Sequence, residues 1–132
     1  MKALYAIVAL ASVAVAPIVQ ADCTYPPPPA KLPDGNTATM QEMLDAKKMV
    51  SQYDKDINAY VACIKLENET AIANGGDKLT KEQKADMERM VVQKNNAAVD
   101  QLQSIADRFN EQIRIYKAKN NPNGDSSSKK KS

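Results

Sequence analysis

The chain has 132 residues, with 18 basic and 16 acidic side chains and no histidine or tryptophan. This length allows one small domain, and the near balance of charge gives no field that would draw the protein to a nucleic acid. Histidine is the commonest general base and the commonest metal ligand in proteins. Its absence argues against an enzyme and a metal site, and leaves an enzyme using carboxylates alone as the catalytic alternative. No cofactor and no small-molecule substrate are expected.

Residues 1–21 have the pattern of a secretory signal peptide. Lys2 precedes an apolar run over residues 3–16, and the small residues Val19 and Ala21 form a cleavage pattern. We expect cleavage after Ala21 and export to the bacterial periplasm or beyond. The alternatives are an uncleaved membrane anchor over residues 3–19, or lipidation at Cys23, which the acidic Asp22 disfavours.

The two cysteines, Cys23 and Cys63, are expected to form a disulfide. In an exported protein a pair of cysteines is more often a disulfide than a metal site. Their separation of 40 residues is also unlike the Cys-x-x-Cys spacing of redox enzymes and zinc sites. Pairing between two molecules and free thiols are the alternatives.

Residues 22–39 form a proline-rich arm that holds five of the seven prolines, four of them consecutive at 26–29. Consecutive prolines adopt the stiff, extended polyproline conformation. We interpret the arm as a strap lying on the protein's own helices, with a ligand for an aromatic-lined groove as the alternative. About 16 residues of arm reach roughly 50 Å, more than the roughly 35 Å of helix between Met40 and Cys63.

A first helix is predicted over residues 40–73. Thr39 and Glu42 have the spacing of a capping box, and Asn74-Gly75-Gly76 is a stop signal. Apolar residues recur at steps of three and four, the pattern of a helix that packs against another helix. These residues are Met43, Ala46, Val50, Tyr53, Ile57, Tyr60 and Ile64.

A second helix is predicted over residues 81–119, beginning at a second capping box formed by Thr80 and Gln83. Its expected apolar stripe consists of Val92, Val99, Leu102, Ala106, Phe109, Ile113 and Tyr116, flanked by Met87, Val91, Ala98 and Ile105. A short connection joins two helices of similar length, which favours an antiparallel hairpin. The predicted fold class is therefore all-α: a coiled-coil-like two-helix hairpin over residues 40–119, with the arm pinned to it by the disulfide.

Residues 120–132 contain no apolar side chain that could pack, so we expect a disordered tail. Its lysines, Lys129, Lys130 and Lys131, could attract an anionic envelope polymer or lipid. A purely solubilising role is the alternative for this tail.

These features predict a non-catalytic protein of the bacterial envelope that acts as an interaction, scaffold or chaperone-like module. Its partner would be an unidentified protein or a second copy of the chain, and binding of an anionic envelope surface through Lys129–Lys131 is the alternative function. In size, export and methionine-containing helices the chain resembles the small periplasmic helical chaperones that shield outer-membrane proteins in transit. No motif is shared with them, so no residue role is transferred.

Overall fold

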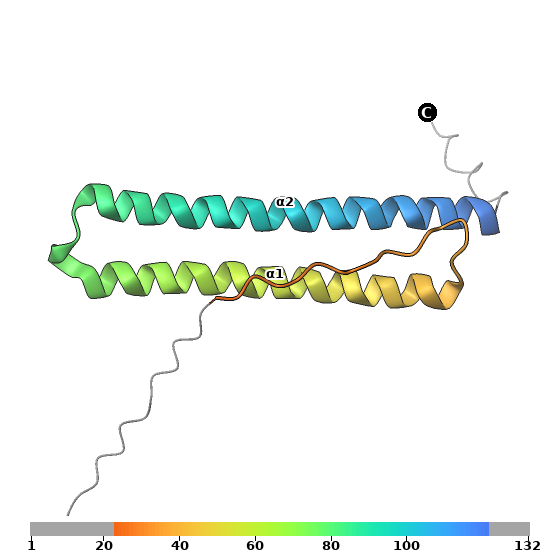
Figure 1. Ribbon diagram of the computed structural model, residues 1–132, viewed down its shortest axis with the longest axis horizontal. Helices are drawn as coiled ribbons and strands as arrows, with labels where there is room; N and C mark the ends of the chain where they lie inside the picture. The colour runs from red at the N-terminus through yellow and green to blue at the C-terminus, as the bar shows by residue number, and fades with distance from the viewer. Residues whose placement is uncertain (1–22, 122–132) are drawn as a thin grey trace, which may run out of the picture.

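Two long helices make up most of residues 23–121, the part of the chain that the computed structural model describes. Helix α1 spans Met40–Gly75 and helix α2 spans Lys81–Asn120, with the 3-10 helix η1 at Gly76–Lys78 between them. The long helices lie side by side and antiparallel (Figure 1). The predicted helical hairpin is confirmed, and no strand occurs within residues 23–121.

Each long helix begins at a threonine that caps it. The Glu42 amide donates to the Thr39 hydroxyl at 3.2 Å, and the Thr39 amide donates to the Glu42 carboxylate at 2.7 Å. Gln83 and Thr80 make the same reciprocal pair of bonds at the start of α2. Both predicted capping boxes are thus present, and they fix where the two helices begin.

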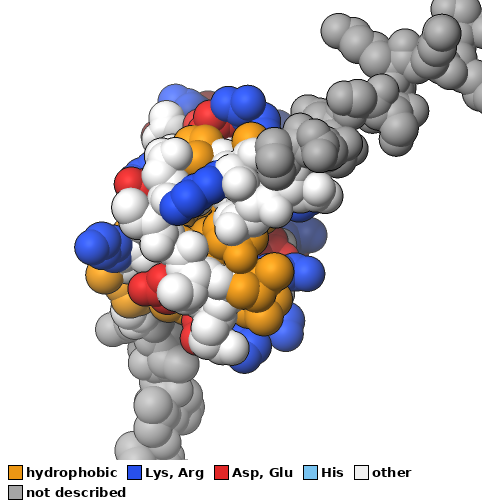
Figure 2. Space-filling model, turned by 90° about the vertical axis from the view of Figure 1, so that its right-hand side faces the viewer, with side chains coloured by type: hydrophobic (Ala, Val, Ile, Leu, Met, Phe, Trp, Pro, Cys, Tyr) orange, Lys and Arg blue, Asp and Glu red, His pale blue; other side chains and the backbone are white. Residues whose placement is uncertain are grey.

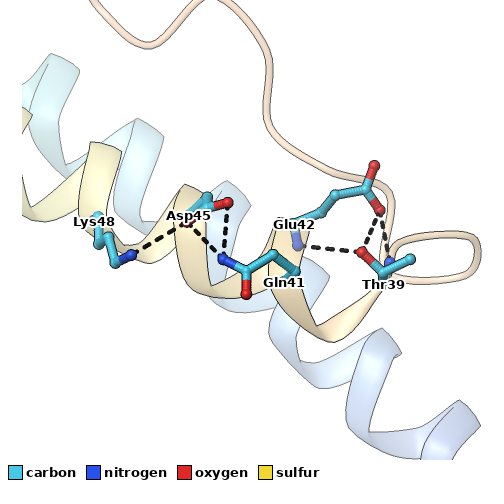
Figure 3. A network of polar contacts seen from close by, with 5 residues as sticks. All are labelled: Thr39, Gln41, Glu42, Asp45 and Lys48. Atoms are coloured by element: carbon cyan, nitrogen blue, oxygen red, sulfur yellow. Dashed lines mark hydrogen bonds and ion pairs between the residues drawn. The ribbon is translucent and has the colours of Figure 1, made fainter.

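Figure 3 shows how the first turns of α1 continue this polar network. Asp45 accepts hydrogen bonds from the Gln41 side chain at 3.0 Å and from Lys48 at 3.3 Å. These side chains are one helical turn apart, and such pairs add a few tenths of a kcal/mol to helix stability. The network is exposed, so it organises the end of the helix without forming an enclosed site.

The helices end slightly later than predicted. Helix α1 continues to Gly75, two residues past the expected 73, and it stops where Gly76 takes a positive φ of 49°. A positive φ is favourable only for glycine, so Gly76 marks the end. Helix α2 includes Asn120, which the sequence analysis assigned to the tail. The Asn120 side chain donates to the Tyr116 carbonyl at 2.8 Å, which satisfies one of the last carbonyls of the helix.

A single apolar seam between the helices forms the core. Five residues of the predicted α1 row are buried, and the other two, Val50 and Tyr60, are partly buried against them. The buried side chains are Met43, Ala46, Tyr53, Ile57 and Ile64 of α1 and Ala98, Ile105 and Phe109 of α2. The regular spacing in α1 therefore identified the packing surface correctly.

The predicted stripe on α2 is partly wrong. Val92 and Val99 are 54% and 49% exposed, whereas Ala98 and Ile105, which were expected only to flank the stripe, are buried. The physical reason is that α2 carries two adjacent apolar rows. Ala98 and Ile105 belong to the row that faces α1, and Val92 and Val99 belong to a neighbouring row that does not.

Residues 23–38 contain neither helix nor strand and run along the hairpin to a turn at residues 35–37 (Figure 1). The disulfide between Cys23 and Cys63 joins the start of this segment to α1, with 5.7 Å between the Cα atoms. The predicted disulfide is thus supported. Residues 1–22 and 122–132, which include the expected signal peptide and Lys129–Lys131, lie outside the described residues, so those predictions stay predictions.

Candidate interaction surface

Over residues 23–121 no group of three or more histidine, cysteine, aspartate or glutamate side chains could hold a metal ion. Within the same range neither helix is long and apolar enough to cross a membrane.

The disulfide end of residues 23–38 lies on the middle of α1. The Tyr25 ring packs edge-on against the Tyr60 ring, with 5.1 Å between the ring centres, three residues before Cys63 along α1. Edge-to-face aromatic pairs stabilise a contact by roughly 1 kcal/mol beyond the apolar area they bury. Of the residues singled out as sites in the sequence, the structure brings together Cys23 and Cys63, and the ring pair adds a contact that the sequence analysis did not assign.

Tyr53 occupies an unusual position beneath this end of the segment. Its side chain is buried in the seam, and its hydroxyl lies beside Tyr25 but makes no hydrogen bond of standard geometry within the described residues. Burial, and then the neighbouring Tyr25, raise the pKa of Tyr53, so the phenol is neutral at physiological pH. An unpaired buried hydroxyl lowers stability, which makes this the one polar defect in the described core.

The other end of the segment docks on the last turns of α2. The Gly35 amide donates to the Gln112 side-chain oxygen at 2.8 Å, and the Asn36 carbonyl accepts from Lys119. Asp34 holds the turn, because its carboxylate accepts from the Asn36 amide at 2.9 Å. Residues 23–38 therefore contact both helices, α1 at one end and α2 at the other.

This segment covers only one side of the hairpin. Glu42, Asp45 and Met49 face it on α1, and Arg108 and Gln112 face it on α2. A helix turns about 100° per residue, so Leu44 and Lys47 point to the opposite side of the seam. We call the side that residues 23–38 leave uncovered the open face.

An apolar groove of about 710 Å³ lies on the open face between the start of α1 and the end of α2. Leu44, which is 45% exposed, lies on its α1 wall. The floor and walls are built by Met40, Met43, Leu44, Val50, Leu102, Ala106, Phe109, Ile113 and Tyr116. Polar side chains, among them Lys47, Asp54, Asn110 and Lys117, also line it.

The groove reaches the end of the hairpin at which α1 begins and α2 ends. Figure 2 looks onto this end and shows a hydrophobic patch bordered by lysine and arginine side chains. An apolar floor with charged edges is the usual composition of a surface that binds another helix.

Comparison with known proteins adds no relative. The chain matches no protein-family model, no curated protein and no solved structure. The interpretation of the groove therefore depends on its own geometry and chemistry.

The groove was not predicted from the sequence, because the apolar residues of α2 were interpreted as one stripe. Ile113 packs against the buried Met43, Ala46 and Phe109 as expected, and together with Ala106 it also lines the groove. The signal that could have separated the two rows is the spacing of seven residues shared by Val92, Val99, Ala106 and Ile113. A helix with a second apolar row beside its packing row has more apolar surface than one neighbour can cover.

Proposed function

We propose that this chain is a non-catalytic, exported protein of the bacterial envelope that acts as a helical interaction module. The apolar groove on the open face is the observation that carries the proposal. Its ligand in this proposal is an amphipathic helix whose apolar side enters the groove. Such a helix would bury the exposed Leu44 and Met40 side chains, and apolar burial is worth about 25 cal/mol per Å².

In the proposal, residues 23–38 act as a strap that makes binding one-sided. The strap is fixed at Cys23 by the disulfide and at Gly35 by its bond to Gln112. A thin two-helix hairpin gains stability from such a staple, and the strap occupies the face that would otherwise also attract partners. A scaffold or chaperone-like role in the envelope would follow from export together with one open face that can bind helices of different shape.

Methionine supports this assignment. Met40 and Met43 both line the groove, and methionine side chains are flexible and polarisable, so they adjust to partners of different shape. A groove built in this way suits helices that share an apolar side without sharing a sequence.

The test is binding of a designed, fluorescent leucine–lysine amphipathic helix to dilute protein, measured by anisotropy. Leu44→Glu places a charge in the groove and is expected to weaken binding at least about tenfold, which corresponds to about 1.4 kcal/mol. Met49→Glu is the matched control, because Met49 is also 45% exposed on α1 but faces the strap side. Equal losses in the two variants, or no binding by the wild type, would contradict the proposal.

A further inference from the structure

Apolar side chains continue on the open face beyond the groove, between polar ones such as Lys65 and Glu88. On α2, the residues Ala85, Val92, Val99, Ala106 and Ile113 repeat at intervals of seven, which we call the outer row. Ala106 and Ile113 line the first groove, and Val92 lines a second groove together with Val61 and Ile72 of α1. Residues seven apart lie on one line along a supercoiled helix, so the outer row runs most of the length of the hairpin.

We propose that a second copy of this chain covers the open face, with the two α2 helices antiparallel and a two-fold axis passing beside Val99. This inference rests on the proposed function and names the partner. A two-fold interface must be self-complementary, because the same patch is used twice. The outer row is self-complementary, because the sizes of its side chains fit those of a second, antiparallel outer row.

The sizes on the two sides of Val99 are complementary, because a larger residue on one side matches a smaller one at the same distance on the other. When two outer rows run antiparallel with Val99 beside its own copy, Val92 lies opposite Ala106 of the second copy. In the same register Ala85 lies opposite Ile113. Each larger residue then faces a smaller one away from the axis, which is how facing layers interdigitate.

The charges that flank the outer row fit the same register. Glu82 lies three residues before Ala85, and Lys117 lies four residues after Ile113. The antiparallel arrangement brings Glu82 of one copy next to Lys117 of the other, and symmetry forms this pair twice. A parallel pairing of the two α2 helices would instead place like charges together, which opposes association.

The α1 side of the open face is consistent with this arrangement. Leu44 and Ile72 line the two grooves at opposite ends of α1. The same two-fold axis passes near Asn58, midway between them, and places Leu44 of one copy over Ile72 of the other. The Asn58 side-chain amide donates to the Asp54 carbonyl of the same helix at 2.8 Å, so the register of this arrangement is set by the apolar and charged pairs.

The size of the open face favours a hairpin over a single helix. The outer row spans 28 residues, about 42 Å, and two helices side by side are roughly 20 Å wide. Their product is about 800 Å² per copy, the area that a stable protein–protein interface buries on each partner. A lone helix would leave either Leu44 or Val99 uncovered, because these half-exposed side chains lie on different helices.

The experiment is sedimentation equilibrium of the full, disulfide-bonded protein as purified from the cells that produce it. Val99→Glu would place two carboxylates together at the axis. Because Val99 is half exposed, this change leaves the hairpin folded, which circular dichroism checks. Met90→Glu is the matched control on α2, since Met90 is 56% exposed and lies outside the outer row.

We expect a dimeric wild type, a dimeric Met90→Glu variant, and a dissociation constant raised about a hundredfold or more in Val99→Glu. Lys117→Glu should also weaken the dimer, and combining it with Glu82→Lys should restore most of the loss. A wild type that stays monomeric, or a dimer indifferent to Val99→Glu, overturns the inference. If that monomer still binds the amphipathic peptide through Leu44, the proposed function stands and only the second copy is excluded.

Discussion

The Gly35 amide donates a hydrogen bond to the side-chain oxygen of Gln112, 77 residues further along the chain, at 2.8 Å. This bond fixes the strap to α2 and requires the backbone to come very close to the helix. A Cβ atom on residue 35 would lie 2.3 Å from the Gln112 carbonyl oxygen and 2.8 Å from the Tyr116 amide nitrogen. Both neighbours are backbone atoms of a helix and cannot move aside cheaply.

Gly35→Ala is therefore expected to detach or displace the strap at this end. The overlap should lower the free energy of unfolding by about 1 to 3 kcal/mol, as overpacking typically does. Chemical denaturation of the oxidised protein measures the change. Asn36→Ala is a useful control, because it removes only an exposed side-chain hydrogen bond to Asp34, and Lys119 contacts the backbone carbonyl, which alanine retains. A Gly35→Ala protein as stable as the wild type would show that residue 35 is not held against α2.

Removing the disulfide should cost more. Cys63→Ser releases a loop of 40 residues, and chain entropy predicts a loss of roughly 3 to 4 kcal/mol, a large share of the stability of a small domain. Thermal melting measures the change, and reduction of the wild type with a dithiol should lower its midpoint to the same level. An unchanged midpoint in the variant would mean that the bridge contributes nothing to the fold.

The predictable and unpredictable parts of the fold differ in physical origin. Capping boxes and the regular α1 row depend on neighbours within one helix, so local spacing was enough to place Thr39, Thr80 and the buried Ile57. Which apolar row of α2 packs on α1 depends on how the two helices are rotated against each other. That rotation follows from packing of the whole seam, and for this reason Val92 and Val99 were misplaced.

The groove was not predicted from the sequence, for a related reason. It exists because the strap lies over one side of the seam and not the other, and strap length alone did not determine the side. The contacts of Gly35 with Gln112 and of Tyr25 with Tyr60 decide it. The tail lysines Lys129–Lys131 remain a prediction from sequence.

Tyr53→Phe tests the polar defect in the core. The substitution removes a buried hydroxyl that lies beside Tyr25 without a hydrogen bond of standard geometry, and it leaves the ring in place. We expect the free energy of unfolding to rise by up to about 1 kcal/mol, since the cost of keeping the hydroxyl out of water disappears. Urea denaturation of the two proteins measures the difference. A clear loss of stability would show instead that the hydroxyl makes a stabilising bond.

The capping box at Thr39 should respond to pH. Hydrogen bonds from the Thr39 backbone and then its side chain hold the pKa of Glu42 below its ordinary value of 4.5. A carboxyl whose pKa is lower in the folded state stabilises the fold above the unfolded pKa, and this stabilisation is lost as the pH falls through the folded pKa. Glu42→Ala should therefore lower the melting temperature at pH 6 to 7, and the gap from the wild type should shrink below about pH 4. A gap that is constant with pH would exclude an ionised Glu42 as its source.

The proposed function requires that the hairpin has one open face and that the strap covers the opposite face. Amide chemical-shift mapping with dilute, isotope-labelled protein and the leucine–lysine helix tests it most directly. The account predicts shifts along the groove, around Leu44 on α1 and around Ile113 on α2, with Gly35 and Asn36 unaffected. Shifts concentrated at Gly35 and its neighbours, with the groove unchanged, would mean that the strap itself is the binding element and would contradict the account.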